Sequence, residues 1–137
     1  MNYSNEINKA LRDFSEGNKI VAYKKLKKIF KLNKNNDQLR FNLAIIADEL
    51  NFKKEAIDNY KFLINKNNHY KSKINLYVLY IKESNYSSAL SVIDKIITNF
   101  PKTENIIKDK AFILYKLKKY DESIQICLKE LNKKRDI

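Results

Sequence analysis

The sequence contains few of the residues that form the tight turns of β-rich folds and the phosphate-binding loops of nucleotide-binding folds. Its 137 residues include one glycine, one proline, one cysteine, one histidine and no tryptophan. So few glycines leave little room for turns that need a positive φ, which argues against hairpin-rich β folds and glycine-rich phosphate loops. No apolar run approaches 18 residues, and the N-terminus lacks the basic-then-apolar layout of a signal peptide. We therefore expect a cytoplasmic protein with no membrane partner.

Catalytic and metal-binding chemistry has few candidates for the same reason. Nucleophilic catalysis would have to use His69 and Cys127, and one histidine with one cysteine cannot build a zinc site without several converging carboxylates. We expect His69 to lie in an exposed polar loop and Cys127 to be a buried structural thiol. The sequence thus predicts a protein that is not an enzyme and has no catalytic, metal-binding or cofactor-binding residues.

Positive charge is what the sequence has in excess. Lysine and arginine number 28 against 16 acidic residues, a net charge of +12. The densest basic run, from Lys24 to Lys34, could attract nucleic acid, although a solvated helix face is its more typical structural role. The tyrosines that could stack on bases fall at packing positions: Tyr23, Tyr60, Tyr77 and Tyr80. A basic nucleic-acid-binding helical repeat remains the less favoured alternative.

Small residues recur in two columns that keep step along the chain. One column comprises Ala10, Ala44, Tyr77 and Ala111, and the other comprises Ala22, Ala56, Ala89 and Ser123. Tyr77 is the exception among them, and we expect it to push the two helices of the third repeat apart or to tilt them. Within each column the residues are 34, 33 and 34 apart. A fixed period of this length indicates a repeat architecture.

Each repeat predicts two amphipathic helices, because apolar residues recur at i, i+3 or i+4, and i+7 in both halves. Where both halves carry a small residue, the two helices can pack closely at their crossing. The fold class is therefore all-α, with eight helices in four hairpins. We expect one domain over residues 1–137, with repeats at approximately 3–36, 37–69, 70–103 and 104–137.

Two local features refine this prediction. In the first repeat, Lys9 and Asp13 occupy core positions while a good apolar stripe lies one residue further on, which predicts a hairpin turn one residue shorter there. Between the repeats, asparagine-rich segments such as 33–36 and 65–68 are expected to close the preceding helices in the left-handed conformation.

The pattern resembles the tetratricopeptide repeat, a 34-residue helix–turn–helix, over nearly the whole chain. Leu43, Ala44 and Leu76 match the first-helix signature of the family, and Tyr86, Ala89 and Pro101 match its turn aromatic, second-helix alanine and closing proline. The resemblance implies a right-handed α-solenoid whose concave groove, lined by the first helices, holds a peptide segment or partner helix. The implied function is a non-catalytic protein–protein interaction scaffold or adaptor.

Residues of the expected groove follow from the same resemblance. Some members carry an asparagine ladder that bonds the ligand backbone, and the matching positions here are Asn8, Asn42, Asn75 and Asp109. An asparagine amide can donate to and accept from a peptide unit at once. Apolar contacts are expected from Phe41, Ile45, Val78, Phe112 and Tyr115.

The last repeat departs from the pattern as an end would. Ser123 replaces alanine and Glu130 stands where an apolar residue is usual. Leu128 and Leu131 could pack on a following helix. This favours a homodimer through an uncapped C-terminal repeat, or a fragment of a longer array that assembles with itself.

Overall fold

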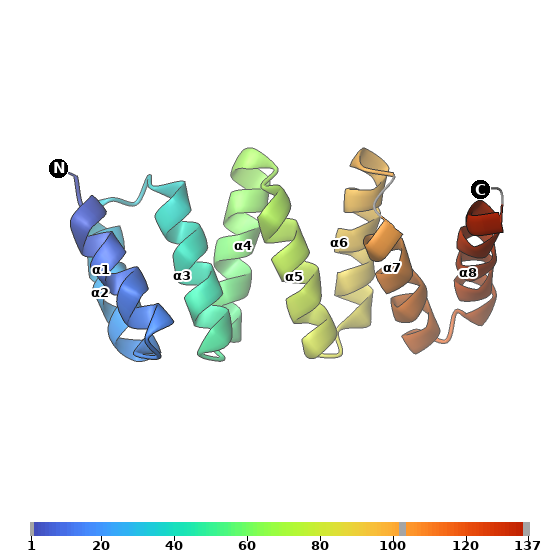
Figure 1. Cartoon of the computed structure of the whole chain (residues 1–137), viewed down its shortest axis with the longest axis horizontal. Coiled ribbons are helices and arrows are strands. Elements are labelled where there is room, and N and C mark those ends of the chain that lie inside the picture. Colours follow the sequence, from blue (N-terminus) through green and yellow to red (C-terminus); the bar gives the residue numbers. More distant parts are fainter. Residues whose placement is uncertain (1, 102–103, 136–137) are drawn as a thin grey trace. The chain divides into compact units, whose positions relative to one another are not determined.

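The computed structural model describes residues 2–101 and 104–135, which form eight helices joined by short turns (Figure 1). The helices are α1 (Ser4–Ser15), α2 (Lys19–Leu32), α3 (Asp37–Glu49), α4 (Lys53–Asn67), α5 (Tyr70–Lys82), α6 (Tyr86–Asn99), α7 (Glu104–Lys116) and α8 (Tyr120–Arg135). The all-α fold class is therefore confirmed. Each expected repeat range contains two consecutive helices.

The chain divides into two compact units, Met1–Ser72 and Lys73–Ile137, with the boundary in the first turn of α5. In the N-terminal unit α1 packs on α2, α3 packs on α4, and α2 packs against α3. In the C-terminal unit α6 packs against α7, and α7 packs on α8. The second helix of one hairpin thus contacts the first helix of the next in both units.

Both columns of small residues lie in the core. All eight positions are at most 9% exposed, and five of the six alanines among them, Ala10, Ala22, Ala44, Ala56 and Ala89, are fully buried. In the fourth repeat the columns touch, because the Ser123 hydroxyl donates to the Ala111 carbonyl at 2.7 Å. Tyr77 is 4% exposed, and its hydroxyl donates to Asp109 Oδ2 at 2.8 Å.

The turn inside each repeat uses one residue in the left-handed conformation. These residues have φ values of +92°, +67°, +56° and +61° and again lie 34, 33 and 34 apart: Gly17, Asn51, Ser84 and Lys118. In each turn, the N–H of the residue that follows the left-handed one donates a hydrogen bond to the carbonyl five residues before it. The N···O distance is 2.8 Å in all four turns, as between Asn18 and Asp13. This is the Schellman closure of a helix.

Two expectations about turns are therefore wrong. The scarcity of glycine does not prevent positive φ, because asparagine, serine and lysine adopt it in three of these four turns. The first hairpin is not shortened either, since Gly17 occupies the same place as Asn51 does in the second. Half-burial of Ile7, Leu11 and Phe14 in α1 is achieved with a turn of ordinary length.

Asparagines between the repeats close one described helix as expected but not another. Asn68 ends α4 with φ +53°, whereas Asn33 ends α2 with φ −146°. Elsewhere the side chain caps a helix start: Asn36 Oδ1 accepts the Leu39 N–H at 3.0 Å, and Asn85 Oδ1 accepts the Ser88 N–H at 3.3 Å. These caps satisfy N–H groups that the first turn of a helix leaves without intrahelical partners.

Helix α8 departs from the expected burial. Cys127 is expected to be buried, yet it is exposed together with the other apolar residues on its side of the helix: Ile124, Leu128 and Leu131. The residues of α8 that are not exposed are Ser123, which is buried and bonded to α7, and Ile126 and Glu130, which are half-buried. The expectation of a buried Cys127 is wrong because no described element covers this side of α8.

Asp37 joins the two ends of the second hairpin. Its carboxylate accepts hydrogen bonds from Lys66 Nζ at 3.0 Å and from Asn67 Nδ2 at 2.7 Å. These bonds lower the pKa of Asp37 below 3.8. The start of α3 is thereby tied to the end of α4.

This tie predicts a pH-dependent contribution to stability. Since the pKa is lower in the folded chain, the bonds stabilise the fold above the unfolded pKa, and this stabilisation is lost as the pH falls through the folded value. Asp37→Asn should therefore lower the Tm at pH 7, and the difference from wild type should shrink as the pH falls from the unfolded pKa through the lowered folded pKa. Thermal melts between pH 2 and pH 7 (by circular dichroism) would measure this.

Asp58→Asn is the matched control, because Asp58 contacts Lys54 at 3.4 Å on an exposed helix face. It should shift the Tm little at any pH. A pH-independent difference for Asp37→Asn would contradict the assignment.

Candidate functional site

In the N-terminal unit the expected ladder residues lie on α1 and α3. Asn8 is exposed, and Asn42 is half-buried. Gln38 lies one helical turn before Asn42, and its Nε2 donates a hydrogen bond to Asn42 Oδ1 at 3.2 Å. Ile45, three residues after Asn42, is also half-buried and lies on the same side of the helix.

In the C-terminal unit the corresponding residues lie on α5 and α7. Asn75 is half-buried, and Asp109 accepts the hydroxyl hydrogen bond of Tyr77. This bond joins the first helices of the third and fourth repeats. The apolar residues three positions further along, Val78 and Phe112, are 40% and 44% exposed. A polar and an apolar side chain thus share the face on both helices.

The aromatic residues expected in the groove differ in their surroundings. Phe41 is 8% exposed and packs against Tyr60 and His69, with ring centroids 6.2 and 4.9 Å away, so the expectation that its ring offers a ligand contact is not met. Phe112 lies edge-on to Tyr86 with centroids 6.3 Å apart, while Tyr115 is 57% exposed. Phe112 and Tyr115 are therefore the accessible aromatics of this set.

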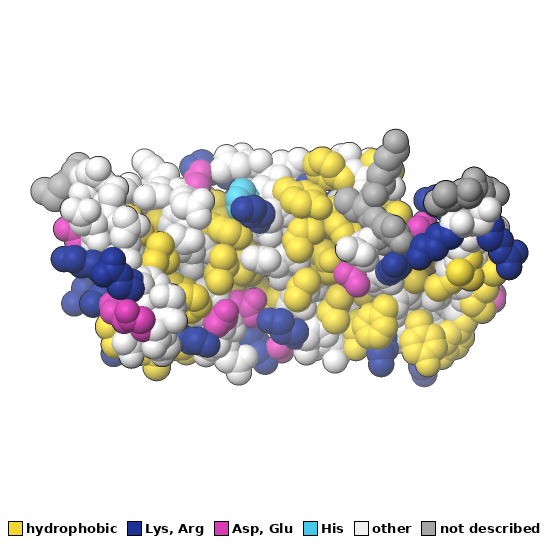
Figure 2. All heavy atoms as spheres, in the orientation of Figure 1, with side chains coloured by type: hydrophobic (Ala, Val, Ile, Leu, Met, Phe, Trp, Pro, Cys, Tyr) yellow, Lys and Arg dark blue, Asp and Glu magenta, His cyan; other side chains and the backbone are white. Residues whose placement is uncertain are grey.

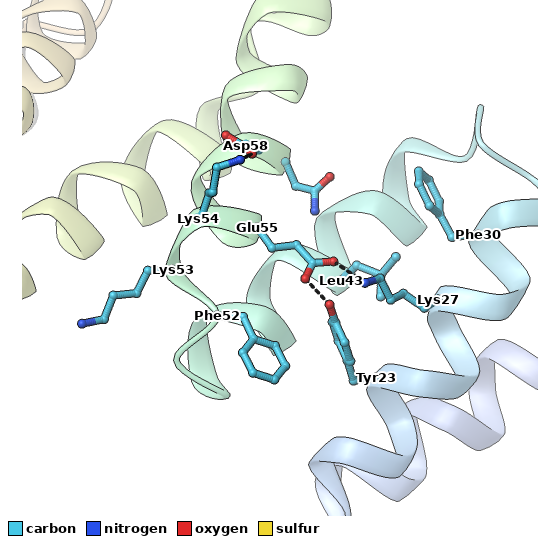
Figure 3. A pocket seen from close by; sticks show the side chains of 10 residues that line it. Tyr23, Lys27, Phe30, Leu43, Phe52, Lys53, Lys54, Glu55 and Asp58 are labelled. Atoms are coloured by element: carbon cyan, nitrogen blue, oxygen red, sulfur yellow. Dashed lines mark hydrogen bonds and ion pairs between the residues drawn. The ribbon is translucent and has the colours of Figure 1, made fainter.

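A cleft of about 710 Å³ lies between the second helices of the first two repeats, α2 and α4 (Figure 3). The sequence pattern did not indicate it, because its residues are far apart in the chain. The lining residues are Tyr23, Lys27, Phe30, Leu43, Phe52, Lys53, Lys54, Glu55, Asp58 and Asn59.

Three polar side chains in the cleft are linked by a hydrogen bond and an ion pair. The Tyr23 hydroxyl donates to Glu55 Oε2, and Lys27 Nζ lies 3.1 Å from Glu55 Oε1 (Figure 3). Burial, followed by the bond to Glu55, raises the pKa of Tyr23 above its ordinary value. Hydrogen bonds to Tyr23 and Glu55 raise the pKa of Lys27. The cluster links α2 to α4 and contains no activated nucleophile.

Arg40 of α3 forms a second link between the first two repeats. Its guanidinium carbon lies 4.7 Å from the Phe30 ring centroid and 3.7 Å from that of Phe62. Nη1 donates to Asn59 Oδ1 at 3.1 Å, while Nε is buried without a hydrogen-bond partner. Burial lowers the pKa of Arg40. The side chain acts as a cation held between two aromatic rings.

His69 lies in the loop between α4 and α5, as expected, but it caps α5 and is half-buried, so the expectation that it is exposed is wrong. Its Nδ1 accepts the Ser72 N–H at 3.2 Å, which requires that nitrogen to be unprotonated, and the Ser72 hydroxyl lies 2.7 Å from the same atom. Within residues 2–101 and 104–135, no three metal-ligating side chains of the His, Cys, Asp or Glu type come together. Nor is any helix in that part of the chain both long enough and apolar enough to span a bilayer.

Comparisons with known proteins identify the fold. No protein-family model matches the sequence, and no curated protein matches it. Solved structures do match. A segment of MamA from Desulfovibrio magneticus RS-1 is 17% identical with a TM-score of 0.78, the match covering 91% of this chain and 71% of that one.

Two further matches carry the repeat in their names. A tetratricopeptide repeat protein from Parabacteroides merdae is 19% identical with a TM-score of 0.82, over 90% of this chain but only half of that one. The tetratricopeptide protein TTC0263 from Thermus thermophilus is 15% identical with a TM-score of 0.66, over 91% of this chain and 71% of that one.

The Arg40 link predicts a stability change that an exposed arginine does not share. Arg40→Ala removes the stacking on Phe30 and Phe62 and should lower the free energy of unfolding by about 1–3 kcal/mol. Arg12→Ala, on the exposed surface of α1, is the matched control and should change it by less than about 0.5 kcal/mol. Urea unfolding followed by circular dichroism measures both, and equal effects would contradict a specific role for Arg40.

Proposed function

We propose that this chain, which has the fold of tetratricopeptide-repeat proteins, is a non-catalytic interaction scaffold that binds an extended peptide segment on its first helices. The observation that carries the proposal is a polar column followed, three residues later, by an apolar one. The pairs are Asn42 and Ile45, Asn75 and Val78, and Asp109 and Phe112. Residues three apart share a helix face, so each helix offers both kinds of contact at one place.

The chemistry of each pair suits a peptide. An asparagine amide can donate to a peptide carbonyl and accept from a peptide N–H, while Asp109 can only accept. Side chains of an extended peptide alternate between two sides, so one side can meet Val78 and Phe112 while the backbone meets the polar column. The two apolar residues are 40% and 44% exposed, unlike the buried Tyr77 and Leu79 that flank Val78.

Two observations favour a peptide over nucleic acid. The tyrosines at packing positions, Tyr23, Tyr60, Tyr77 and Tyr80, are 1–7% exposed, which leaves them no face for base stacking. Within the basic run, Lys25 is 2.7 Å from Asp13 and Lys27 is 3.1 Å from Glu55. Part of the positive charge is thus already paired within the chain.

A double substitution on the ladder tests the proposal. Peptides selected on the chain from a phage-displayed random library serve as the probe, and fluorescence anisotropy gives the dissociation constant. Asn42→Ala with Asn75→Ala should raise it about tenfold or more, because each unit then lacks one of its proposed hydrogen bonds to a ligand backbone. The control is Asn65→Ala with Asn99→Ala, which changes one exposed asparagine on a second helix in each unit.

Unchanged peptide affinity in the ladder variant, with loss in the control variant, would contradict the assignment of the first helices. A labelled thymidine oligonucleotide provides the comparison probe. We expect no saturable binding of it near 150 mM salt, and binding that weakens steeply as salt is added would favour the nucleic-acid alternative.

A further inference from the structure

Helix α8 carries a continuous apolar stripe that no described residue covers. Ile124, Leu128 and Leu131 are 55%, 54% and 58% exposed, and Cys127 is exposed between them. Their spacing of three, one and three places all four on one side of the helix. Figure 2 shows hydrophobic side chains gathered on the surface over α7 and α8. This α8 stripe lies on a second helix and is separate from the proposed peptide-binding residues.

The α8 stripe differs from the corresponding surface of the earlier repeats at Leu128. The residues 34, 67 and 101 positions earlier are charged and exposed: Asp94, Lys61 and Lys27. A leucine here widens the apolar surface toward a side of the helix that the other repeats leave in water. The wider surface indicates a contact that the other second helices do not make.

Glu130 makes the opposite change. The matching residues of the other repeats are apolar and at most 8% exposed: Ile96, Leu63 and Ile29. In the fourth repeat this place holds a carboxylate, paired with Lys133 at 3.0 Å. Its side chain is 15% exposed, and a further repeat stacked as α3 stacks on α2 would remove this remaining contact of the charge with water, which is costly. The pattern therefore disfavours another repeat of the same kind as the occupant.

The N-terminal helix of a second copy does not fit the α8 stripe either. Lys9 and Arg12 on α1 are exposed at the places where α3 buries Leu43 and Ile46. Head-to-tail stacking would press these two cations against leucine side chains. The surface of α1 that carries Lys9 and Arg12 is therefore charged, whereas the exposed stripe of α8 is apolar.

The charges of α8 complement a second α8 that runs in the opposite direction. Its first turn is acidic, with Asp121 and Glu122, and its last turn is basic, with Lys133, Lys134 and Arg135. An antiparallel pair places acidic ends beside basic ends, while a parallel pair places like charges together. The helix dipoles also favour the antiparallel arrangement, because it places the positive end of one helix beside the negative end of the other.

We propose that α8 is a self-association surface, on which the α8 stripes of two copies pack antiparallel across a two-fold axis. The contact is isologous and closes at the dimer. Pairing Ile124 with Leu131 of the other copy sets the axis between Cys127 and Leu128. A hollow of about 280 Å³ beside the stripe, bordered by Ala111, Ile126 and Leu131, has room for a side chain from the partner.

Sedimentation equilibrium of the 137-residue chain tests the proposal between about 5 and 500 µM, the range that suits a small interface. We expect a monomer–dimer equilibrium whose dissociation constant rises at least about tenfold in Leu128→Lys. Leu32→Lys is the matched control, because Leu32 is 71% exposed on α2, and it should leave the equilibrium unchanged. Ile124→Lys provides a second stripe variant, and circular dichroism verifies the fold of each.

The single cysteine gives an independent measurement. A short bis-maleimide should link wild-type chains through Cys127 at least about tenfold faster than it links Cys127→Ser/Ser87→Cys, whose thiol lies on exposed α6 surface. Monomers throughout the concentration range, growth beyond the dimer, a dimer indifferent to Leu128→Lys, or equal linking rates would each overturn the proposal. Because the peptide assay uses different residues, its failure is distinguishable from failure here.

Discussion

The close crossing of two helices at small residues is the constraint on which this structure depends. Eight positions in two columns are at most 9% exposed, and in the fourth repeat the Ser123 hydroxyl bonds directly to the Ala111 carbonyl. A short approach between helices brings the larger apolar residues around the crossing into contact, so that Leu26, Ile46 and Ile93 are buried. The faces that remain outside the hairpins are then available for binding.

Much of the fold could be predicted from the sequence because period and packing agree. Apolar spacing indicates helices, and the two columns set their pairing. The turns were harder to predict, since Ser84 and Lys118 adopt positive φ where glycine would ordinarily be expected. The Schellman bonds, repeated at 2.8 Å in each turn, hold these residues there. The hydrogen bonds that close the helix end therefore outweigh the preference of serine and lysine for negative φ.

The candidate sites were less predictable, because they combine residues from different repeats. Nothing in the local sequence of Arg40 indicates that Phe30 and Phe62 enclose it, or that Tyr23 reaches Glu55 across the first two repeats. Burial also separates two aromatic residues that the family resemblance assigns to one groove: Phe41 lies in the core, while Phe112 is exposed. Deviations from the repeat were more informative, since Glu130 and Leu128 mark α8 as a different surface.

The central claim is that the small columns, rather than overall hydrophobicity, hold together the hairpins in which both crossing residues are small, as Ala44 and Ala56 are in the second repeat. Ala44→Leu adds apolar volume at a fully buried crossing, and Ser87→Leu adds it on exposed α6 surface. Urea unfolding should show Ala44→Leu destabilised by about 1–3 kcal/mol or more, with Ser87→Leu within about 0.5 kcal/mol of wild type. An Ala44→Leu chain as stable as wild type would contradict the account.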